Sequence, residues 1–294
     1  MRDTAELAGR VWLNGRIVPA ARARISALDR GFLYGDGLFE TIRCYQGVPF
    51  LLNEHLQRMS RSAAFLGLPL PEVDWSRVIR SLLAANSLQN SDASVRITVS
   101  RGPARPGLVP PRNVAPTALA FALPVPKTLA ADQRRGVKVI TVPLARLGPL
   151  SAHKLLDYVP AILARTAAAK QKAKEALYVH GGFVCEATTA NVFAVFDGAL
   201  VTPPIDELLP GITRALVVSL AEKAGIPLVE RRIAVEEVAK AQEIFLTSAV
   251  VEVLPVVEVD HITIADGKPG TVTVRLRREY RQRVNQLVAC EGRK

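Results

Sequence analysis

The sequence is poor in cysteine and in long apolar runs, and each shortage excludes a class of protein. Its 294 residues include three cysteines, Cys44, Cys185 and Cys290, which lie far apart and form no C-x-x-C pair. This spacing argues against a disulfide framework or a zinc site and predicts a reducing, cytoplasmic environment. No apolar run approaches the roughly 18 residues of a membrane span. The first ten residues lack the apolar centre of a secretory signal.

Aromatic residues are also scarce, at 5% of the chain, which is too few to predict a stacking platform for nucleic-acid bases. The formal net charge of +11 favours an anionic partner when taken alone. The basic residues are scattered, however, and their densest run, at 275–283, follows the four-residue spacing of Leu276, Tyr280 and Val284. That pattern predicts a helix with a buried stripe and a solvated basic face. We therefore expect neither nucleic acid nor a membrane as partner.

Local patterning predicts an α+β chain of two domains. Residues 1–123 alternate strand and turn signals with an amphipathic helix at 53–66, which predicts a smaller α+β domain. The stretch 124–136 combines prolines with charges and is the predicted linker. Residues 137–294 contain further strands, turns and helices, and we expect them to form a larger second domain.

Tight turns and alternating side chains give the local detail. Asn14-Gly15 and Gln46-Gly47 each separate two apolar stretches and predict two-residue β-hairpins, as do Gly181-Gly182 and Asp197-Gly198 later in the chain. Residues 38–45 are predicted to form a strand whose side chains alternate between two faces. One face carries Leu38, Glu40, Ile42 and Cys44, and the other carries Phe39, Thr41, Arg43 and Tyr45.

Three local features are candidates for ligand contacts. Pro210-Gly211 precede a predicted helix with Ile212, Leu216 and Leu220 on its inner stripe. Free backbone N–H groups at such a start favour an anion, above all phosphate, although many such starts bind nothing. Ser248 and Ala249 stand at a strand end, where small residues allow close approach of a ligand or simply form a tight turn. Arg58 lies among apolar neighbours and either pairs with a carboxylate or clamps a phosphate.

Lys154 is the fourth candidate. It stands in PLSAHKLLDY, between a predicted apolar strand and a predicted helix start, whereas Lys170 and Lys223 lie in polar runs. Apolar surroundings lower the pKa of an amine and make it nucleophilic. An ordinary, partly exposed lysine is the alternative interpretation of this position.

Six segments follow one another in an order that resembles a known family. They are DRGFLYGDGLFETIR (29–43), EHLQRM (54–59), HKLLDY (153–158), EALYVHGGFVCEATTANVF (175–193), LLPGITR (208–214) and EIFLTSAVVEVLPV (243–256). Together they resemble the class IV pyridoxal-phosphate aminotransferases, the group of branched-chain aminotransferases, D-amino acid aminotransferases and aminodeoxychorismate lyase. The resemblance extends from about Val11 to Leu287.

The resemblance implies a fold, a cofactor and an assembly. The implied fold is the two-domain α+β architecture of the D-amino acid aminotransferase type (PLP fold type IV), with the cofactor in the cleft between the domains. The implied cofactor is pyridoxal 5′-phosphate. The implied assembly is a homodimer whose partner subunits contribute residues to each other's pockets.

By position, the resemblance also implies roles for individual residues. Lys154 resembles the residue that forms a Schiff base with the cofactor and then moves a proton. Glu186 resembles the carboxylate that keeps the pyridine nitrogen protonated, so that the ring is an electron sink. The other implied cofactor contacts are Arg58 on the phosphate, Leu209 on the ring face, Ile212 and Thr213 as backbone donors, and Ser248 with Ala249 in a second phosphate loop. The implied substrate-pocket residues are Tyr34, Phe39, Arg43 and Arg105.

The sequence departs from the family pattern in three places. Ala187 stands where glycine often follows the carboxylate. Ala249 replaces a common threonine, which removes a hydroxyl and keeps the backbone N–H. The loop 100–111 is unusually rich in proline and matches neither the D-amino acid nor the branched-chain pattern closely.

Three functions are compatible with these residues. The first hypothesis is transamination between an amino acid, of branched-chain or D type, and a 2-oxo acid such as 2-oxoglutarate or pyruvate. The second is a lyase that releases pyruvate and 4-aminobenzoate from aminodeoxychorismate. Thr41, where branched-chain enzymes typically carry glycine, favours the lyase or D-amino acid group. A protein that binds pyridoxal phosphate without catalysis is the third.

Overall fold

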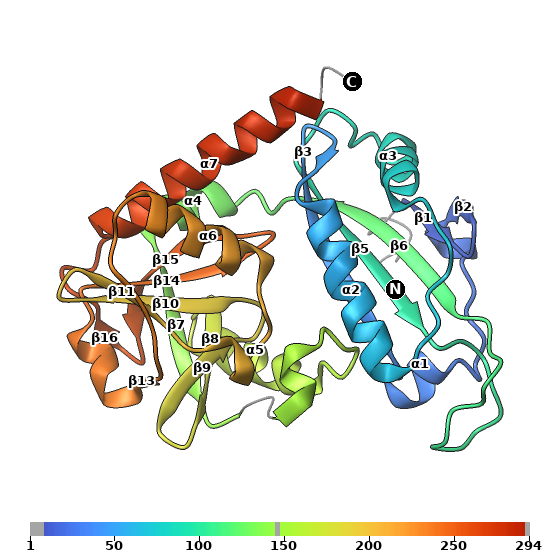
Figure 1. Ribbon diagram of the computed structural model, residues 1–294, viewed down its shortest axis with the longest axis horizontal. Coiled ribbons are helices and arrows are strands. Elements are labelled where there is room, and N and C mark those ends of the chain that lie inside the picture. The colour runs from blue at the N-terminus through green and yellow to red at the C-terminus, as the bar shows by residue number, and fades with distance from the viewer. Residues whose placement is uncertain (1–8, 145–147, 292–294) are drawn as a thin grey trace. The chain divides into compact units, whose positions relative to one another are not determined.

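The computed structural model describes residues 9–144 and 148–291, which form two compact units. The first unit comprises residues 9–125 with His153–Asp157 and residues 286–291. The second comprises Pro126–Ala152, apart from the undescribed residues 145–147, and Tyr158–Asn285. Each unit is built on one β-sheet with helices packed against it (Figure 1).

An antiparallel six-stranded sheet forms the centre of the first unit, in the order β2-β1-β6-β5-β3-β4. Its strands are β1 (Arg10–Leu13), β2 (Arg16–Pro19), β3 (Gly37–Tyr45), β4 (Val48–Pro49), β5 (Ala93–Ser100) and β6 (Thr117–Pro124). The helical segments are η2 (Ala20–Arg22), α1 (Arg30–Tyr34), α2 (Leu52–Leu66) and α3 (Trp75–Ala85).

The hairpins and the strand alternation predicted for this unit are confirmed. Asn14 and Gln46 have the left-handed φ angles, 45° and 48°, that two-residue hairpin turns require. Leu38, Ile42 and Cys44 all belong to one buried core, which α2 and α3 complete on the same face of the sheet (Figure 1). The face that carries Phe39 is therefore the one turned away from these helices.

The second unit contains a ten-stranded mixed sheet in the order β12-β11-β10-β14-β15-β7-β8-β9-β13, with β16 paired to β15. Its strands are β7 (Val137–Val142), β8 (Glu175–His180), β9 (Phe183–Ala187), β10 (Asn191–Phe196), β11 (Ala199–Thr202), β12 (Leu228–Glu230), β13 (Ile233–Ala234), β14 (Glu243–Ser248), β15 (Glu252–Val259) and β16 (Ile262–Thr263). Its helical segments are α4 (Leu129–Arg135), η3 (Gly148–Ala152), α5 (Val159–Lys170), η4 (Ile205–Glu207), α6 (Ile212–Lys223), η5 (Val235–Lys240) and α7 (Thr271–Glu291), of which residues 286–291 belong to the first unit.

The prediction of a linker at 124–136 is wrong for most of its length, because α4 occupies residues 129–135. Leu129 and Gln133 are buried, and the Gln133 side chain donates to the Val251 carbonyl at 2.9 Å. These contacts make α4 part of the second unit. The predicted second domain, 137–294, also differs from the structure, since residues 153–157 belong to the first unit.

Helix α6 begins where the sequence predicted but buries a different stripe. Thr213, Val217 and Ala221 are buried, whereas the predicted stripe residues Ile212, Leu216 and Leu220 are only partly covered. Small side chains let this helix lie close to the sheet. The buried Arg214, which pairs with Glu230 at 3.0 Å, also fixes its rotation. The predicted stripe, which followed the spacing of large apolar side chains, is therefore wrong.

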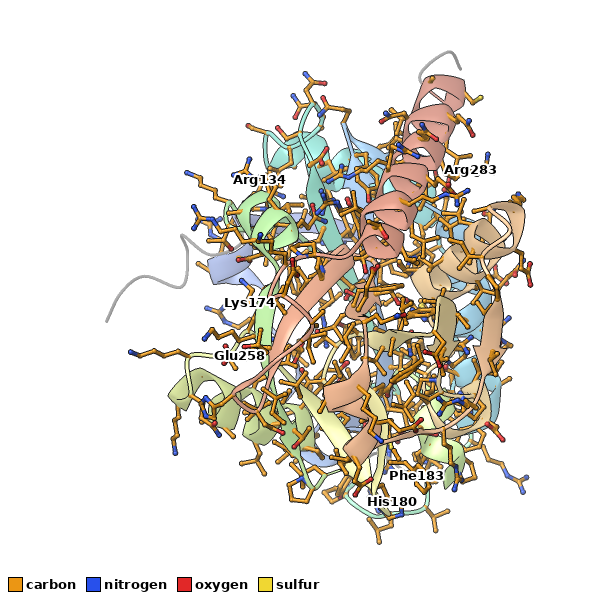
Figure 2. All side chains as sticks on the ribbon, turned by 90° about the vertical axis from the view of Figure 1, so that its left-hand side faces the viewer. Arg134, Lys174, His180, Phe183, Glu258 and Arg283 are labelled. Carbon is orange, nitrogen blue, oxygen red and sulfur yellow. The ribbon has the colours of Figure 1, made fainter. Side chains whose placement is uncertain are left out.

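Helix α7 has the amphipathic character that the basic run predicted. Leu276, Tyr280 and Val284 are buried, and Arg283 points outward from the same helix (Figure 2). Within residues 9–144 and 148–291, no helix combines the length and apolar character needed to cross a membrane.

Candidate active site

Lys154 lies in an irregular segment whose backbone pairs with one edge of β3. The Phe39 N–H donates to the Lys154 carbonyl at 2.9 Å, and the Leu156 N–H donates to the Gly37 carbonyl at 3.2 Å. Glycine at position 37 suits this close approach, because a Cβ there would lie 2.7 Å from Leu156 Cδ1 and 2.6 Å from the Val99 carbonyl oxygen of β5. Helix α5 begins only at Val159, so the backbone of Lys154 is positioned by the sheet rather than by a helix start.

The Lys154 side chain lies beside Phe39 of β3. Its Nζ is 4.6 Å from the centre of the Phe39 ring, and the residue is half-buried. The preceding residue, His153, stacks on Phe65 of α2 with ring centres 4.0 Å apart and places Nδ1 3.2 Å from the Ser62 hydroxyl. Backbone pairing and this stack together fix the lysine from two sides.

Arg58 projects from α2 onto a buried carboxylate of β3. Its Nε and Nη2 each donate to Glu40 at 2.7 Å, and His55 Nδ1 donates to the same carboxylate at 2.7 Å. Burial by itself raises the pKa of Glu40, but the Arg58 charge and the hydrogen bonds from Arg58 and His55 lower that pKa to about 2. Burial lowers the pKa of His55, so its imidazole is neutral at pH 7. Glu40 therefore balances the charge of Arg58 and orients its guanidinium.

Glu40→Gln is expected to reduce the free energy of unfolding by roughly 3–5 kcal/mol at pH 7, because it leaves the buried Arg58 without a countercharge. The folded-state pKa is lowered, so this contribution is present above about pH 4.5 and is lost as the pH falls towards 2. Urea unfolding of parent and variant at a series of pH values measures this contribution of Glu40 to the free energy of unfolding. Glu54→Gln, at an exposed position of the same helix, is the control. A parent–variant difference that stays constant down to pH 2.5 contradicts the assignment.

The predicted substrate residues of the first unit do not form one group. Phe39 is buried beside Lys154, whereas Arg43 is ion-paired with Asp92 at 2.8 Å. Arg43 lies four positions after Phe39 on the strand, or about 13 Å away. Arg105 is exposed in the loop after β5. The Tyr34 hydroxyl accepts a hydrogen bond from the Gly107 N–H of that loop at 2.9 Å.

Arg96 of β5 is a candidate that the sequence did not reveal. Its guanidinium carbon lies 3.5 Å from the centre of the Phe39 ring, and Arg96 is paired across the strands with Thr41. The alternation of β5 places Arg96 on the same sheet face as Phe39. The alternation of β5 could have indicated which face Arg96 occupies. It could not show that Arg96 lies near Phe39, because that depends on the register between β3 and β5, which are far apart in the sequence.

A cavity of about 460 Å³ also lies in the first unit. Thr98, Ser100 and Leu119 of the sheet line it, together with Leu156 and parts of residues 25–32. None of the predicted site residues is among its lining residues, although Leu156 lies two positions after Lys154.

Glu186 of β9 is the predicted carboxylate in the second unit. It is 9% exposed, and its Oε2 accepts from the Asn191 side-chain amide at 3.2 Å and from the Leu209 N–H at 3.3 Å. The Asn191 amide also donates to the Leu209 carbonyl at 2.9 Å. These bonds fix the carboxylate and bring Leu209 beside it.

The start of α6 has the properties of an anion site. Gly211 is its N-cap, and no side chain caps the first turn, which contains Ile212 and Thr213. A Cβ at Gly211 would overlap the Asn191 side-chain oxygen, so the turn requires glycine. The N–H groups of such a turn are suited to a phosphate.

Ser248 and Ala249 lie at the end of β14, in the turn that leads to β15. The buried Glu252 anchors this turn, because it accepts from Arg281 at 2.6 Å and from Gln133 at 3.2 Å. The hydroxyl of the adjoining Thr247 is buried without a hydrogen-bond partner among the described residues. A ligand with acceptor oxygens would satisfy such a donor.

The donor set fits pyridoxal phosphate. An amine, a buried carboxylate and a phosphate-binding helix start match the aldehyde, the ring nitrogen and the phosphate of that cofactor. Lys154 and Arg58 belong to the first unit, and Glu186 and the start of α6 belong to the second.

Comparison with known proteins gives one consistent match. The sequence model of the family described as Amino-transferase class IV matches residues 37–259. A putative branched-chain-amino-acid aminotransferase of Methanocaldococcus jannaschii is 37% identical over 280 residues, which cover 92% of this chain and 95% of that protein. A D-alanine aminotransferase of Staphylococcus haemolyticus is 34% identical over 274 residues, covering 92% of this chain and 96% of that protein.

Solved structures with similar folds include both aminotransferases and a lyase. The Escherichia coli branched-chain amino acid aminotransferase aligns with a TM-score of 0.85 at 29% identity, covering 92% of this chain and 93% of that one. The branched-chain aminotransferase of the thermophilic archaeon Thermoproteus uzoniensis, with norvaline, aligns with a TM-score of 0.84 at 31% identity, covering 94% of each chain. The 4-amino-4-deoxychorismate lyase of Pseudomonas aeruginosa aligns with a TM-score of 0.81 at 29% identity, covering 92% of this chain and 98% of that one.

The similar structures include one with the amino form of the cofactor. It is a branched-chain amino acid aminotransferase with pyridoxamine 5′-phosphate, and it aligns with a TM-score of 0.84 at 30% identity, covering 98% of this chain and 95% of that one. The cofactor that the donor set fits is therefore of the kind found in a protein of the same fold.

Proposed function

The chain belongs to the class IV aminotransferases, and on that premise we propose that it moves an amino group between an amino acid and a 2-oxo acid, with pyridoxal phosphate held on Lys154. Its α+β architecture is PLP fold type IV, as predicted from the sequence, and the chain is a pyridoxal-phosphate-dependent transaminase. A cytoplasmic location is part of the same proposal, supported by three free cysteines of which Cys44 is buried.

The observation that carries the proposal is the fixed position of Lys154 on β3. An amine that must hold the cofactor's aldehyde and then move a proton at the substrate α carbon needs a defined backbone position. The two backbone hydrogen bonds to Gly37 and Phe39 supply it. When bound, the cofactor supplies the electron sink that deprotonation of an amino acid requires.

The remaining proposed contacts follow from the donor set. Glu186 would bond the ring nitrogen and Leu209 would cover one face of the ring. The phosphate would accept hydrogen bonds from the backbone N–H groups of Ile212, Thr213 and Ala249. It would also accept them from the Ser248 hydroxyl and the guanidinium of Arg58. Glu40 supports this role of Arg58, because it holds the guanidinium in one orientation.

The substrate side of the site is proposed to include Phe39, Tyr34 and the exposed Arg105, to which Arg96 is added. An arginine beside Phe39 suits the carboxylate of an amino acid or a 2-oxo acid. Arg43 is proposed to stabilise the far end of β3 through Asp92 instead of contacting substrate. Both 2-oxoglutarate and pyruvate are expected to serve as acceptors, because either presents a carboxylate.

The assay that tests the function offers L- and D-amino acids, branched-chain ones and alanine included, with 2-oxoglutarate or pyruvate. Transfer of the amino group from at least one donor is the expected result. The competing lyase activity is measured as 4-aminobenzoate released from aminodeoxychorismate, since the Pseudomonas aeruginosa lyase shares the fold. Release of 4-aminobenzoate without transamination of any donor contradicts the proposal.

A homodimer is the proposed assembly, supported by exposed apolar residues in each unit. Val159, Ile162 and Leu163 of α5 are 64%, 61% and 58% exposed, and in the first unit Leu108 and Val109 are 84% and 86% exposed. Apolar groups so exposed and so close in sequence are typical of a protein–protein contact. A second copy of the chain is the proposed occupant.

Ile162→Glu combined with Leu163→Glu is therefore expected to convert the dimer into a folded monomer, because it places charges in an apolar contact. Light scattering after size-exclusion chromatography measures the mass. Val274→Glu, at a 42% exposed position of α7, is the matched control and should leave the dimer intact. A double variant that remains dimeric at micromolar concentration rules out α5 as part of the interface.

A further inference from the structure

The loop that carries Arg105 is held by residues outside it. It follows β5, is exposed, and contains Pro103, Pro106, Pro110 and Pro111, which have no N–H to donate. Its backbone is tied instead to the segment 28–34. The Ala104 N–H donates to the Leu28 carbonyl at 3.2 Å, and the Gly107 N–H donates to the Tyr34 hydroxyl at 2.9 Å.

Arg30 makes the strongest of these connections. It is 3% exposed, although arginine is rarely buried so deeply. Its Nη1 donates to the Gly107 carbonyl at 2.6 Å and its Nη2 to the Leu108 carbonyl at 3.2 Å. A planar guanidinium with two such bonds fixes both the position and the direction of the loop two residues after Arg105.

Asp36 in turn fixes Arg30. Its Oδ2 accepts from Arg30 Nε at 2.7 Å and from Arg101 Nε at 2.8 Å. Burial raises the pKa of Asp36, but the hydrogen bonds and charges of Arg101 and Arg30 lower it below its usual range, so the carboxylate is ionised at neutral pH. The two nitrogens at the other end of Arg101 donate to the carbonyls of Gly67 and Leu66, at 2.8 and 2.9 Å. One carboxylate therefore connects the last turn of α2 with the 107–108 carbonyls.

We infer that Arg30 and Asp36 are positioning residues that fix the 103–111 loop and thereby set the affinity for the 2-oxo acid that Arg105 receives. This inference rests on the proposed function for its second half, because it takes Arg105 as a carboxylate-binding residue. The first half of the inference, that Arg30 and Asp36 fix the 103–111 loop, depends only on the hydrogen bonds of these two residues. Neither residue contacts the reacting atoms in this account; both act through the loop.

Hydrogen exchange of the holoenzyme tests the first half without turnover. In Asp36→Asn and in Arg30→Lys, the hydrogen-bonded amides of Ala104 and Gly107 are expected to exchange at least about tenfold faster than in the parent, because the loop loses its anchor. Asp260→Asn is the matched control, since Asp260 accepts two hydrogen bonds from Thr141 in the second unit. Unchanged exchange at Ala104 and Gly107 in both variants overturns the inference.

Steady-state kinetics with 2-oxoglutarate test the second half. Asp36→Asn is expected to raise KM about tenfold while kcat changes less than about threefold, the pattern of lost binding rather than lost chemistry. Combined with Arg105→Ala, it should raise KM no further than Arg105→Ala alone, because both act through the same contact. Additive effects, or a fall in kcat with constant KM, overturn it. If the parent transaminates no 2-oxo acid, the proposed function fails, and hydrogen exchange alone decides the role of Arg30 and Asp36.

Discussion

Lys154→Ala is expected to abolish transamination, with turnover falling by roughly 10⁴-fold or more, because the variant loses both the amine that holds the cofactor and the group that moves the proton. The fold should persist, because the hydrogen bonds that join residues 154 and 156 to β3 are made by the backbone. Turnover is measured with the best donor from the amino acid panel, at saturating pyridoxal phosphate. Added primary amines should restore part of the proton transfer.

The matched control is Lys170→Ala, which removes an exposed lysine from the end of α5. It should keep parental turnover. If Lys154→Ala retained more than about one hundredth of the parental kcat, the loss would be smaller than a covalent amine and proton carrier supplies. The lysine would then have another role, and the proposed function would lose its main support.

Glu186→Gln is the second change with a large expected effect. Turnover should fall by roughly 10²-fold, because a neutral amide no longer stabilises positive charge on the ring nitrogen. The cofactor should still bind, since the glutamine oxygen can accept from Asn191 and from the Leu209 N–H as the carboxylate does. Stopped-flow measurement of the first half-reaction separates the slowed proton abstraction from binding.

Glu258→Gln provides the comparison for loss of a carboxylate elsewhere in the second unit. Glu258, labelled in Figure 2, pairs with Lys138 at 2.6 Å, and its replacement should leave the half-reaction rate unchanged. A Glu186→Gln variant as fast as the parent contradicts the role of this carboxylate. A variant that loses the cofactor altogether would instead assign Glu186 to binding.

Much of the local structure could be predicted because its causes are local. Asn-Gly and Gln-Gly pairs favour left-handed turns by themselves, and the four-residue spacing of Leu276, Tyr280 and Val284 describes one helix face. The alternation along β3 likewise placed Glu40 on the face that α2 covers. Each of these features can be predicted from residues that are close together in the sequence.

The parts that could not be predicted depend on contacts between distant segments. Lys154 is positioned by hydrogen bonds to residues of β3, far earlier in the chain, which no local pattern reveals. Arg58 was predicted either to pair with a carboxylate or to clamp a phosphate, and only the structure identifies Glu40 as its partner. The helix α4 was mistaken for a linker because its burial depends on the turn before β15. The network of Arg30, likewise, joins separate segments of the first unit.

The most direct test of the account is the location of the cofactor on the chain. The purified protein, saturated with pyridoxal phosphate, is reduced with borohydride, digested and analysed by mass spectrometry. The account predicts a phosphopyridoxyl group on Lys154 and parental recovery of the unmodified peptides that carry the other lysines. Modification of a different lysine, or a chain that gains no mass on reduction, would contradict it.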